Sequence, residues 1–232
     1  MIKDFNRNLI VVAHPDDEIL GCGGLMNKLI KNKKKVKVIF IAEGSSCRFD
    51  ENNLNYNEVE DEIKKREKSA KLALADLGVR DFAFYNLTCG KLNSYPIIEI
   101  AKIIENEIKI FKPDTIFTHS NYDVNYDHKT VFQACLQATR PVDLKNIVKK
   151  LYSFEVVSSS EWRYDESFKP NTFIDIDKEF NKKIKALKKY KNELRSFPHP
   201  RSVEGIKVLS KFRGSQSGLV CAEAFKLIRA FD

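Results

Sequence analysis

The sequence predicts an α/β fold in which a mostly parallel, twisted sheet is covered by helices on both faces. Short apolar runs typical of strands alternate along the chain with longer segments whose apolar residues recur at helical spacing. The first run, Leu9-Ile10-Val11-Val12-Ala13, is apolar throughout, as expected of a strand buried on both sides. We therefore expect a three-layer, Rossmann-like arrangement with any ligand site at the carboxyl ends of the strands.

Strands and helices are expected to alternate from the amino terminus onwards. The strands are expected at residues 8–13, 36–42, 81–85, 115–118 and 151–157, and the helices at residues 19–32, 58–77, 96–111 and 128–138. Gly78, Pro113 and Pro141 follow helix ends, where glycine favours termination and proline interrupts no hydrogen bond. After Ser158 the pattern loosens. There we expect a short strand, a helix and a closing segment at residues 171–176, 178–194 and 219–229.

The composition is typical of one globular domain. With 232 residues the chain is long enough for one sizeable domain and short for two. No apolar stretch approaches the length of a membrane span, and residues 1–6 lack the basic-then-apolar pattern of a secretion signal. The five cysteines are widely spaced and contain no CxxC pair, which favours reduced residues. A cytoplasmic location is therefore expected.

The net charge of +8 raises the question of a nucleic-acid partner. The lysines of residues 178–191 surround an apolar stripe that includes Phe180, Ile184 and Leu187, which is the pattern of an amphipathic helix packed on a core. No zinc finger, RNA-binding aromatic signature or arginine-rich arm accompanies the charge. We therefore expect no nucleic-acid partner, although a positive surface would attract an anionic small molecule.

An imidazole and three carboxylates follow the first strand directly, in His14-Pro15-Asp16-Asp17-Glu18. His14 and Asp17 are close enough across a turn to bind one cation from two sides. Asp16 could then accept a proton from a water at that cation, a role that glutamate plays in other zinc hydrolases. A simple helix cap is the alternative, but a cap needs one acid and no histidine.

A second cluster of the same chemistry, residues 118–128, follows the strand expected at 115–118. Three of the four histidines of the chain lie in these two loops, which neighbouring parallel strands would bring together. His14, Asp17 and His128 with an open fourth position match a catalytic Zn2+ site. His119 is either a ligand or a residue of the core.

Further motifs are distributed along nearly the whole chain. They include Gly21 to Gly24, Glu43-Gly44, Arg66 with Leu77-Gly78, Asp123 to His128, Ala138 to Pro141, Pro198 to Ser202, Arg213 to Ser215 and Ala222 to Phe225. Together with Ala13 to Glu18, they resemble the LmbE-like, or PIG-L, family of zinc-dependent N-acetylglucosaminyl deacetylases. The first motif and the Asp127-His128 pair are the specific part of this resemblance.

The resemblance implies a single deacetylase domain spanning residues 1–232. It implies that His14, Asp17 and His128 are the zinc ligands and that Asp16 is the general base. Asp127 would support the metal site from outside the ligand set.

Two further roles are carried over from the family. Arg66 matches the position of a substrate-binding arginine. Asn125 is a departure, because many members carry a histidine there that is thought to polarise the carbonyl and assist the leaving amine. An asparagine amide can donate a hydrogen bond to an oxyanion but cannot deliver a proton. The acid that protonates the leaving amine must therefore be sought elsewhere.

Three polar loops carry candidate substrate contacts. Glu43 and Arg48 lie in the loop of residues 43–57, which either lines the substrate cleft or is an ordinary exposed loop. Trp162 is the only tryptophan, and its aromatic face would suit a sugar ring as well as a core. His199 is held between two prolines and is either the missing proton donor or a surface residue.

The expected function is a zinc-dependent hydrolase that removes the acetyl group from an N-acetylated amino sugar or sugar conjugate. The partner would be a small-molecule amino sugar, with an anionic one favoured by the charge, and a homo-oligomer is left open. A metal-dependent phosphoesterase is an alternative because His and Asp ligands also suit Mn2+ or paired metals. A non-catalytic sugar-binding protein is another. A nucleotide-binding oxidoreductase is disfavoured, because Gly21 to Gly24 lack the GxGxxG spacing.

Overall fold

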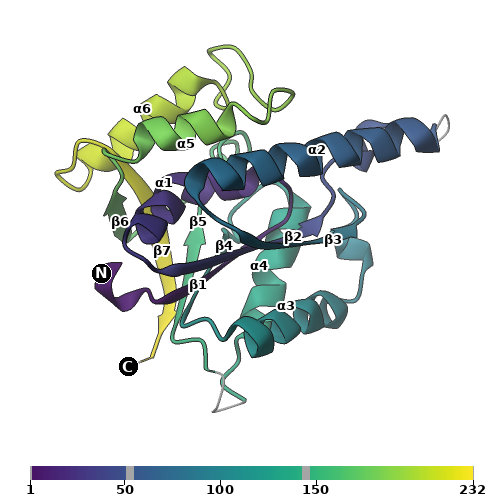
Figure 1. Cartoon of the computed structure of the whole chain (residues 1–232), viewed down its shortest axis with the longest axis horizontal. Helices are drawn as coiled ribbons and strands as arrows, with labels where there is room; N and C mark the ends of the chain where they lie inside the picture. The colour runs from purple at the N-terminus through teal and green to yellow at the C-terminus, as the bar shows by residue number, and fades with distance from the viewer. Residues whose placement is uncertain (1, 51–54, 143–146, 232) are drawn as a thin grey trace.

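The computed structural model describes residues 2–50, 55–142 and 147–231. Within them lies a sheet of seven strands in the order β3-β2-β1-β4-β5-β7-β6 (Figure 1). The strands are β1 (Arg7–Val12), β2 (Lys35–Ala42), β3 (Asp81–Leu87), β4 (Thr115–His119), β5 (Lys150–Phe154), β6 (Thr172–Asp175) and β7 (Ala222–Ala230). Strands β1 to β5 pair in parallel with one another, whereas β7 is antiparallel to both β5 and β6.

Helices cover both faces of the sheet. They are α1 (Asp17–Lys31), α2 (Tyr56–Leu77), α3 (Ile97–Phe111), α4 (Tyr126–Ala138), α5 (Phe180–Leu187) and α6 (Val203–Ser215), with 3-10 turns η1 (Ile2–Asp4), η2 (Ser46–Arg48) and η4 (Leu92–Ser94). Helices α1, α2, α5 and α6 lie on one face, and α3 and α4 on the other (Figure 1). The predicted fold class is confirmed.

Strand β1 shows why its sequence is apolar throughout. Ile10 and Val12 pack into the core cluster shared with α1, whereas Leu9 and Val11 pack into the cluster shared with α3 and α4. A central strand with helices on both faces has no side that faces water. The first helix packs closely on this layer as well, because a Cβ added at Gly21 would collide with the ring of Phe154.

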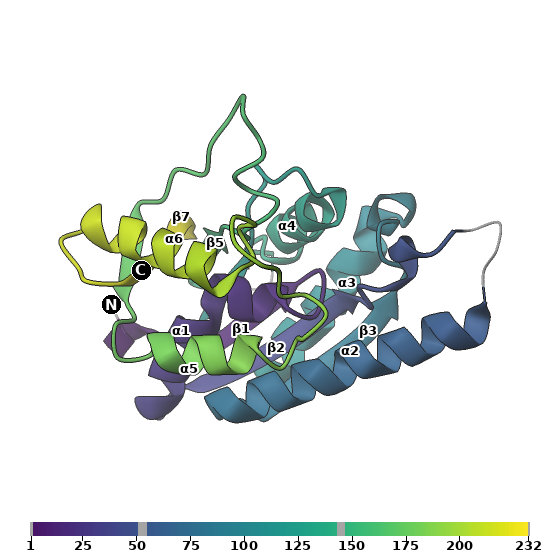
Figure 2. The ribbon, with the colours of Figure 1, turned by 90° about the horizontal axis from the view of Figure 1, so that it is seen from above.

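The order of the strands creates the place for a site. The chain builds β2 and β3 on one side of β1 and then returns to place β4 on its other side. Strands β1 and β4 pair in parallel, so the loops that follow them leave the same edge of the sheet. A sheet of this kind opens a crevice at this point of reversal, where ligands bind. The helices that begin in these loops, α1 and α4, lie on opposite faces of the sheet, and Figure 2 shows α1, α5 and α2 together on the face nearer the viewer.

The expected elements agree with the structure in the first part of the chain and less well after Phe154. Helix α4 begins two residues before the expected start at His128, because Asn125 caps it. The helix expected at 178–194 ends at Leu187. The closing segment is a strand, β7, and α6 was not expected at all. The side chain of Ser202 accepts a hydrogen bond from the N–H of Gly205 and caps α6, which is a signal that the sequence contained.

Two further expectations concern membrane spans and the polar loop of residues 43–57. None of the described helices combines the length and the apolar character needed to cross a membrane. Residues 51–54, part of the polar loop expected at 43–57, lie outside the described residues.

Candidate metal centre and active site

Three side chains from the two predicted loops meet at the edge of the sheet. His14 follows β1, Asp17 is in the first turn of α1 and His128 is in the first turn of α4. The ligand atoms of all three lie within 4.8 Å of one another. Asp17 Oδ2 is 3.4 Å from His14 Nδ1 and 3.3 Å from His128 Nε2. All three residues are buried.

These residues fit a divalent cation. His128 Nε2 and Asp17 Oδ1 are buried, and neither takes part in a hydrogen bond. Buried polar atoms almost always have a partner, and imidazole nitrogen and carboxylate oxygen are zinc ligands. Three protein ligands with room for a fourth group are typical of a catalytic zinc site.

The electrostatics of the centre also favour a cation. Burial lowers the pKa of His128, but the charges of Asp17 and Asp123 outweigh it and raise that pKa to about 10. Burial raises the pKa of Asp17, but the charge of His128 and the hydrogen bonds from His128 and His14 outweigh it and hold the pKa well below its ordinary value. The carboxylates therefore stabilise positive charge at this point, which a bound metal ion would supply in place of a proton.

Asp123 orients His128 from outside the ligand set. Its Oδ2 lies 2.9 Å from His128 Nδ1, which turns His128 Nε2 toward the centre. The hydroxyls of Ser159 and Ser160 donate to the same oxygen at 2.9 and 3.0 Å. A carboxylate that fixes a ligating imidazole in this way is common in metal sites. Asp123 lay within the second motif, but the sequence did not single it out.

Asp127 plays the corresponding part for His14. Its Oδ2 lies 2.8 Å from His14 Nε2, which leaves Nδ1 facing Asp17. The backbone N–H groups of Gly90 and Leu92 donate to its two oxygens at 2.6 and 3.0 Å. The structure therefore places Asp127 behind His14, one of the three proposed ligands.

Asp16 lies beside the three proposed ligands but points to two arginines. Its Oδ1 is 3.2 Å from Arg66 Nη2, and its Oδ2 is 2.9 Å from Arg201 Nη1. Burial raises the pKa of Asp16 above its ordinary value, although Arg201 and Arg66 oppose that rise. Its backbone has φ of 122°, which is rare for a residue other than glycine and costs about 1–3 kcal/mol. Sequence reasoning gave Arg201 no role here.

Glu18 holds the strained backbone of Asp16 in place. Its Oε2 accepts a hydrogen bond from the N–H of Asp16 at 2.9 Å, and its Oε1 accepts one from the hydroxyl of Tyr190 at 2.5 Å. Burial raises the pKa of Glu18 to about 8. The third carboxylate of the motif therefore positions Asp16 instead of binding metal.

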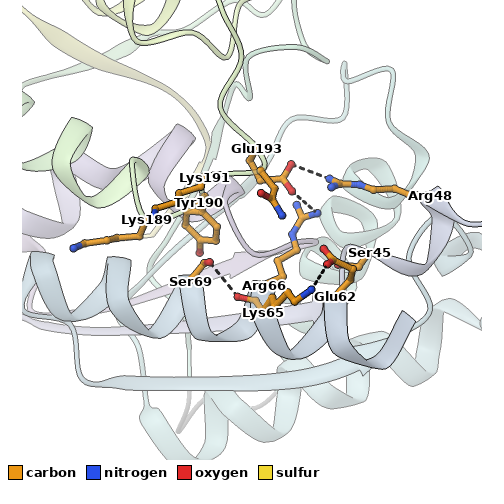
Figure 3. Close-up of a pocket in the computed structure, with 11 residues that line it drawn as sticks. Ser45, Arg48, Glu62, Lys65, Arg66, Ser69, Lys189, Tyr190, Lys191 and Glu193 are labelled. Carbon is orange, nitrogen blue, oxygen red and sulfur yellow. Dashed lines mark hydrogen bonds and ion pairs between the residues drawn. The ribbon is translucent and has the colours of Figure 1, made fainter. Parts of the chain in front are cut away.

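Glu193 gathers three arginines at the mouth of the site. Its Oε1 lies 3.1 Å from Arg66 Nη1, and its Oε2 lies 2.8 Å from Arg48 Nη2 and 3.3 Å from Arg201 Nη1. Figure 3 draws the contacts with Arg66 and Arg48. Arg66 also donates to the carbonyls of Pro15, at 2.9 Å, and Gly44. Its guanidinium therefore joins the loop after β1 to the loop after β2. The sequence analysis placed Glu193 in a helix expected at residues 178–194, but this helix ends at Leu187.

A polar pocket of about 180 Å³ lies beside this group (Figure 3). Cationic side chains outnumber carboxylates in its lining. The lining residues are Ser45, Arg48, Glu62, Lys65, Arg66, Ser69, Lys189, Tyr190, Lys191, Asn192 and Glu193.

The remaining predicted site residues have other contacts in the structure. Asn125 caps α4, where its Oδ1 accepts a hydrogen bond from the N–H of Asp127 at 2.9 Å. His199 Nδ1 accepts a hydrogen bond from the N–H of Arg201 at 3.0 Å, and the half-exposed ring of Trp162 lies edge-on to His199. The loop of residues 198–202 therefore reaches Asp16 through Arg201.

Glu43 and His119 are buried, and both accept hydrogen bonds from backbone N–H groups. The carboxylate of Glu43 accepts hydrogen bonds from the N–H groups of Ser46 and Cys89 at 3.0 and 2.8 Å. His119 Nε2 accepts one from the N–H of Ala13 at 2.8 Å, and its ring stacks on that of His128. Burial lowers the pKa of His119 to about 3, so it is neutral. His119 was expected to be either a metal ligand or a residue of the core, and these contacts favour a residue of the core.

The geometry can support hydrolysis at a metal ion. Three buried ligands can hold the ion, and a separate carboxylate, Asp16, lies next to them and can exchange a proton with a bound substrate or water. Nothing in this arrangement resembles a phosphate-binding glycine loop.

Comparisons with known proteins agree with this geometry. A model of the PIG-L family, described as GlcNAc-PI de-N-acetylase, matches residues 9–139. An uncharacterized deacetylase, YaiS, from Escherichia coli strain K12 is 28% identical over 192 residues, which cover 79% of this chain and 90% of YaiS.

Solved structures share the fold at lower identity. The N,N'-diacetylchitobiose deacetylase from Pyrococcus horikoshii is 20% identical, with a TM-score of 0.79 over 98% of this chain and 85% of its own. GalB from Pseudomonas putida KT2440, a 4-carboxy-2-hydroxymuconate hydratase, is 20% identical, with a TM-score of 0.71 over 97% of this chain and 98% of its own. At these identities the likeness concerns the fold alone.

Proposed function

The chain belongs to the PIG-L family, and from this premise we propose that it is a metal-dependent hydrolase that removes the acetyl group from an N-acetylated amino sugar or sugar conjugate. One observation carries the proposal. His14, Asp17 and His128 converge within 4.8 Å, with ligand atoms of Asp17 and His128 left without a hydrogen bond, beside a carboxylate that belongs to no ligand group. The names of the deacetylases from Escherichia coli and Pyrococcus horikoshii support the same reaction class.

His14, Asp17 and His128 would hold the metal, which we propose to be Zn2+. The ion supplies Lewis acidity at the acetamide carbonyl and lowers the pKa of the attacking water toward about 7. Asp123 and Asp127 keep the two imidazoles turned toward it, through contacts of 2.9 and 2.8 Å.

Asp16 would act as the general base. It accepts a proton from the attacking water while the new C–O bond forms at the acetamide carbon. Burial with two opposing arginines leaves the pKa of Asp16 above its ordinary value, which makes it a better proton acceptor than an exposed carboxylate. Glu18 and Tyr190 keep its backbone in the required conformation.

Two groups remain for the oxyanion and the leaving amine. The side-chain amide of Asn125 would donate a hydrogen bond to the developing oxyanion, because capping occupies only its oxygen. Protonated Asp16 would return its proton to the departing amine, since it lies beside the metal ligands. His199 is the alternative donor, on the same loop as Arg201. The products are acetate and the free amino sugar.

The substrate would enter past the arginine group around Glu193. Arg48 and the lysines of the pocket in Figure 3 would attract an anionic substituent, and Trp162 offers an aromatic face to a sugar ring. Arg66 would act mainly by fixing the loops around Asp16, and Glu43 by joining the loops that follow β2 and β3. A cytoplasmic location remains a prediction.

Release of acetate from a panel of N-acetylated sugars, nucleotide sugars and lipid-linked sugars tests the proposal. We expect stoichiometric acetate and free amine from at least one class, only in the metal-loaded protein. Phosphate esters on the same panel serve as the control for a phosphoesterase. Metal-loaded protein that binds an N-acetylated sugar but releases no acetate would favour the non-catalytic alternative.

A further inference from the structure

A pair of cysteines joins two loops that follow the neighbouring strands β2 and β3. Cys47 is in η2, after β2, and Cys89 follows the end of β3. Their Sγ atoms are 2.8 Å apart. Both thiols are free, and Cys47 is exposed whereas Cys89 is buried. The reaction proposed above uses neither of them.

The surrounding groups hold the two loops together. The carboxylate of Glu43 accepts hydrogen bonds from the N–H of Ser46 on one loop and from the N–H of Cys89 on the other, at 3.0 and 2.8 Å. Gly90 has φ of 74°, and a Cβ placed on it would lie 3.0 Å from the Cβ of Cys47. A glycine at this position therefore suits both the backbone conformation and the close approach of the loops.

The two sulfurs are close to the separation of a covalent bond. The S–S bond of a disulfide is about 2.05 Å long, so the Sγ atoms would need to approach by only about 0.8 Å. Cys47 lies in a 3-10 turn of three residues, none of them buried, which can take up a movement of this size. Oxidation of the pair would therefore leave the backbone of both loops nearly unchanged.

A small oxidant can reach the exposed member of the pair. A cavity of about 450 Å³ is lined in part by Cys47 and Cys89, and cavities of this size admit small molecules. Lys91 lines the same cavity, and its positive charge favours an anionic compound. The hydrogen bond with Cys89 lowers the pKa of Cys47 to about 6, and the thiolate is the form of cysteine that attacks a disulfide.

We propose that Cys47 and Cys89 are a site of reversible modification, at which an anionic low-molecular-weight disulfide oxidises the pair to an intramolecular disulfide bond. The sulfur of Cys47 attacks one sulfur of the small disulfide, whose S–S bond breaks and releases one thiolate. Cys89 then attacks the Cys47 sulfur and releases the second thiolate. Each protein thiol gives up one proton, and each released thiolate takes one up. Two protein thiols are oxidised by two electrons, and one small disulfide is reduced to two thiols.

The order of the two steps follows from the surroundings of the thiols. The hydrogen bond with Cys47 and burial raise the pKa of Cys89, so Cys89 stays protonated while Cys47 carries the negative charge. That charge disappears when Cys47 forms the mixed disulfide, which makes it easier for Cys89 to lose its proton. Cys47 is therefore the attacking thiol and Cys89 the resolving thiol.

The disulfide bond would stabilise the folded chain. It would close a loop that contains the whole of α2 and β3, and a cross-link over a long loop restricts the unfolded chain. It would also fix the loop on which the N–H of Gly90 donates to Asp127 Oδ2 at 2.6 Å. The midpoint of thermal unfolding is expected to rise by about 5 °C or more on oxidation.

Incubation of the metal-loaded protein with oxidised glutathione, followed by a count of free thiols in the denatured chain and by mass spectrometry, tests the proposal. In the natural chain the count should fall from the five free cysteines by two, with no glutathione retained, and dithiothreitol should restore it. Cys89→Ser should instead retain one glutathione on Cys47, because no resolving thiol releases it. Cys47→Ser should lose no thiol and retain no glutathione, because the exposed thiol is gone.

Controls separate the pair from the other thiols. Cys221→Ser removes a buried cysteine elsewhere in the chain and should still lose two thiols to oxidised glutathione. Cys47→Ser is expected to fold, because the side chain is exposed, and circular dichroism checks each variant. Its thermal midpoint should not respond to oxidised glutathione.

Two results would overturn the proposal. A natural chain that keeps all its free thiols, or that retains glutathione as stably as Cys89→Ser does, would show that the pair does not form a disulfide bond. A chain that loses two thiols without a rise in its thermal midpoint would contradict the stabilising role of that bond.

Discussion

Residues 2–142 and residues 147–231 contribute differently to one site. The first region supplies all three proposed metal ligands, each two to nine residues beyond the end of β1 or β4. The second region supplies none of them; it supplies Arg201, which contacts Asp16, and Ser159 and Ser160, which contact Asp123. The match to the PIG-L family, residues 9–139, falls within the first region. The proposed metal site is thus built by the parallel sheet, whereas the later part of the chain contributes to the charge around Asp16, the proposed base.

The largest expected effect comes from removing a ligand in the first region. His128→Ala should lose most of its metal and reduce acetate release below detection, because two remaining ligands rarely hold zinc tightly. Metal content per chain and turnover are measured on the same samples. Arg201→Gln, in the second region, is the matched control and should keep its metal. Equal metal loss in both variants would contradict the assignment of metal binding to the first region alone.

The next effect concerns Asn125, which both caps α4 and carries the proposed oxyanion donor. Asn125→Ala should lower turnover by about a hundredfold or more, since one such donor is worth about 3 kcal/mol in the transition state. Asn125→Ser is the control, because serine keeps the helix cap without an amide donor. We expect kcat to fall in both variants with the metal retained. Full activity in Asn125→Ser would mean that only the cap matters.

A smaller effect is expected for the charge that the second region contributes. Arg201 lowers the pKa of Asp16, which burial raises. In Arg201→Gln the pKa of Asp16 should therefore be higher still. A base must be deprotonated to act, so the acidic limb of the kcat/KM profile should move to higher pH, with turnover about tenfold lower. Arg201→Lys should restore much of the limb. An acidic limb at unchanged pH in Arg201→Gln would mean that Arg201 does not influence the pKa of the base.

The smallest effect is expected for His199. Its ring contacts Arg201 and Trp162, whereas Asp16 lies beside the metal ligands and can return the proton itself. His199→Ala should therefore lower turnover by less than about tenfold and keep the basic limb of the pH profile. Loss of the basic limb in this variant would instead identify His199 as the donor to the leaving amine.

The sequence predicted the first region well because its signals are local. A strand such as β1 that is buried on both faces must be apolar, and the residues that follow it must lie at the edge of the sheet. The convergence of His14, Asp17 and His128 could be predicted for this reason. Gly21 has a local role in packing, because a Cβ at this position would collide with the ring of Phe154 and keep α1 away from the sheet.

The contacts that tune the site could not be predicted, because they join distant parts of the chain. Arg201 and Asp16 are 185 residues apart, and Tyr190 and Glu18 are 172 apart. A surface arginine and one that pairs with a buried carboxylate look the same in a sequence. Glu193 was hidden for another reason, because amphipathic spacing continued to residue 194 although the helix ends at Leu187.

The central claim is that adjacent carboxylates have separate roles, with Asp17 as a metal ligand and Asp16 as the base. Metal content and acetate release measured together for Asp16→Asn and Asp17→Asn test it most directly. We expect Asp16→Asn to keep close to one metal ion per chain and to lose roughly two to four orders of magnitude in turnover, the usual worth of a positioned proton acceptor. Asp17→Asn should lose the metal itself. Metal loss in Asp16→Asn, with the metal retained in Asp17→Asn, would contradict the assignment.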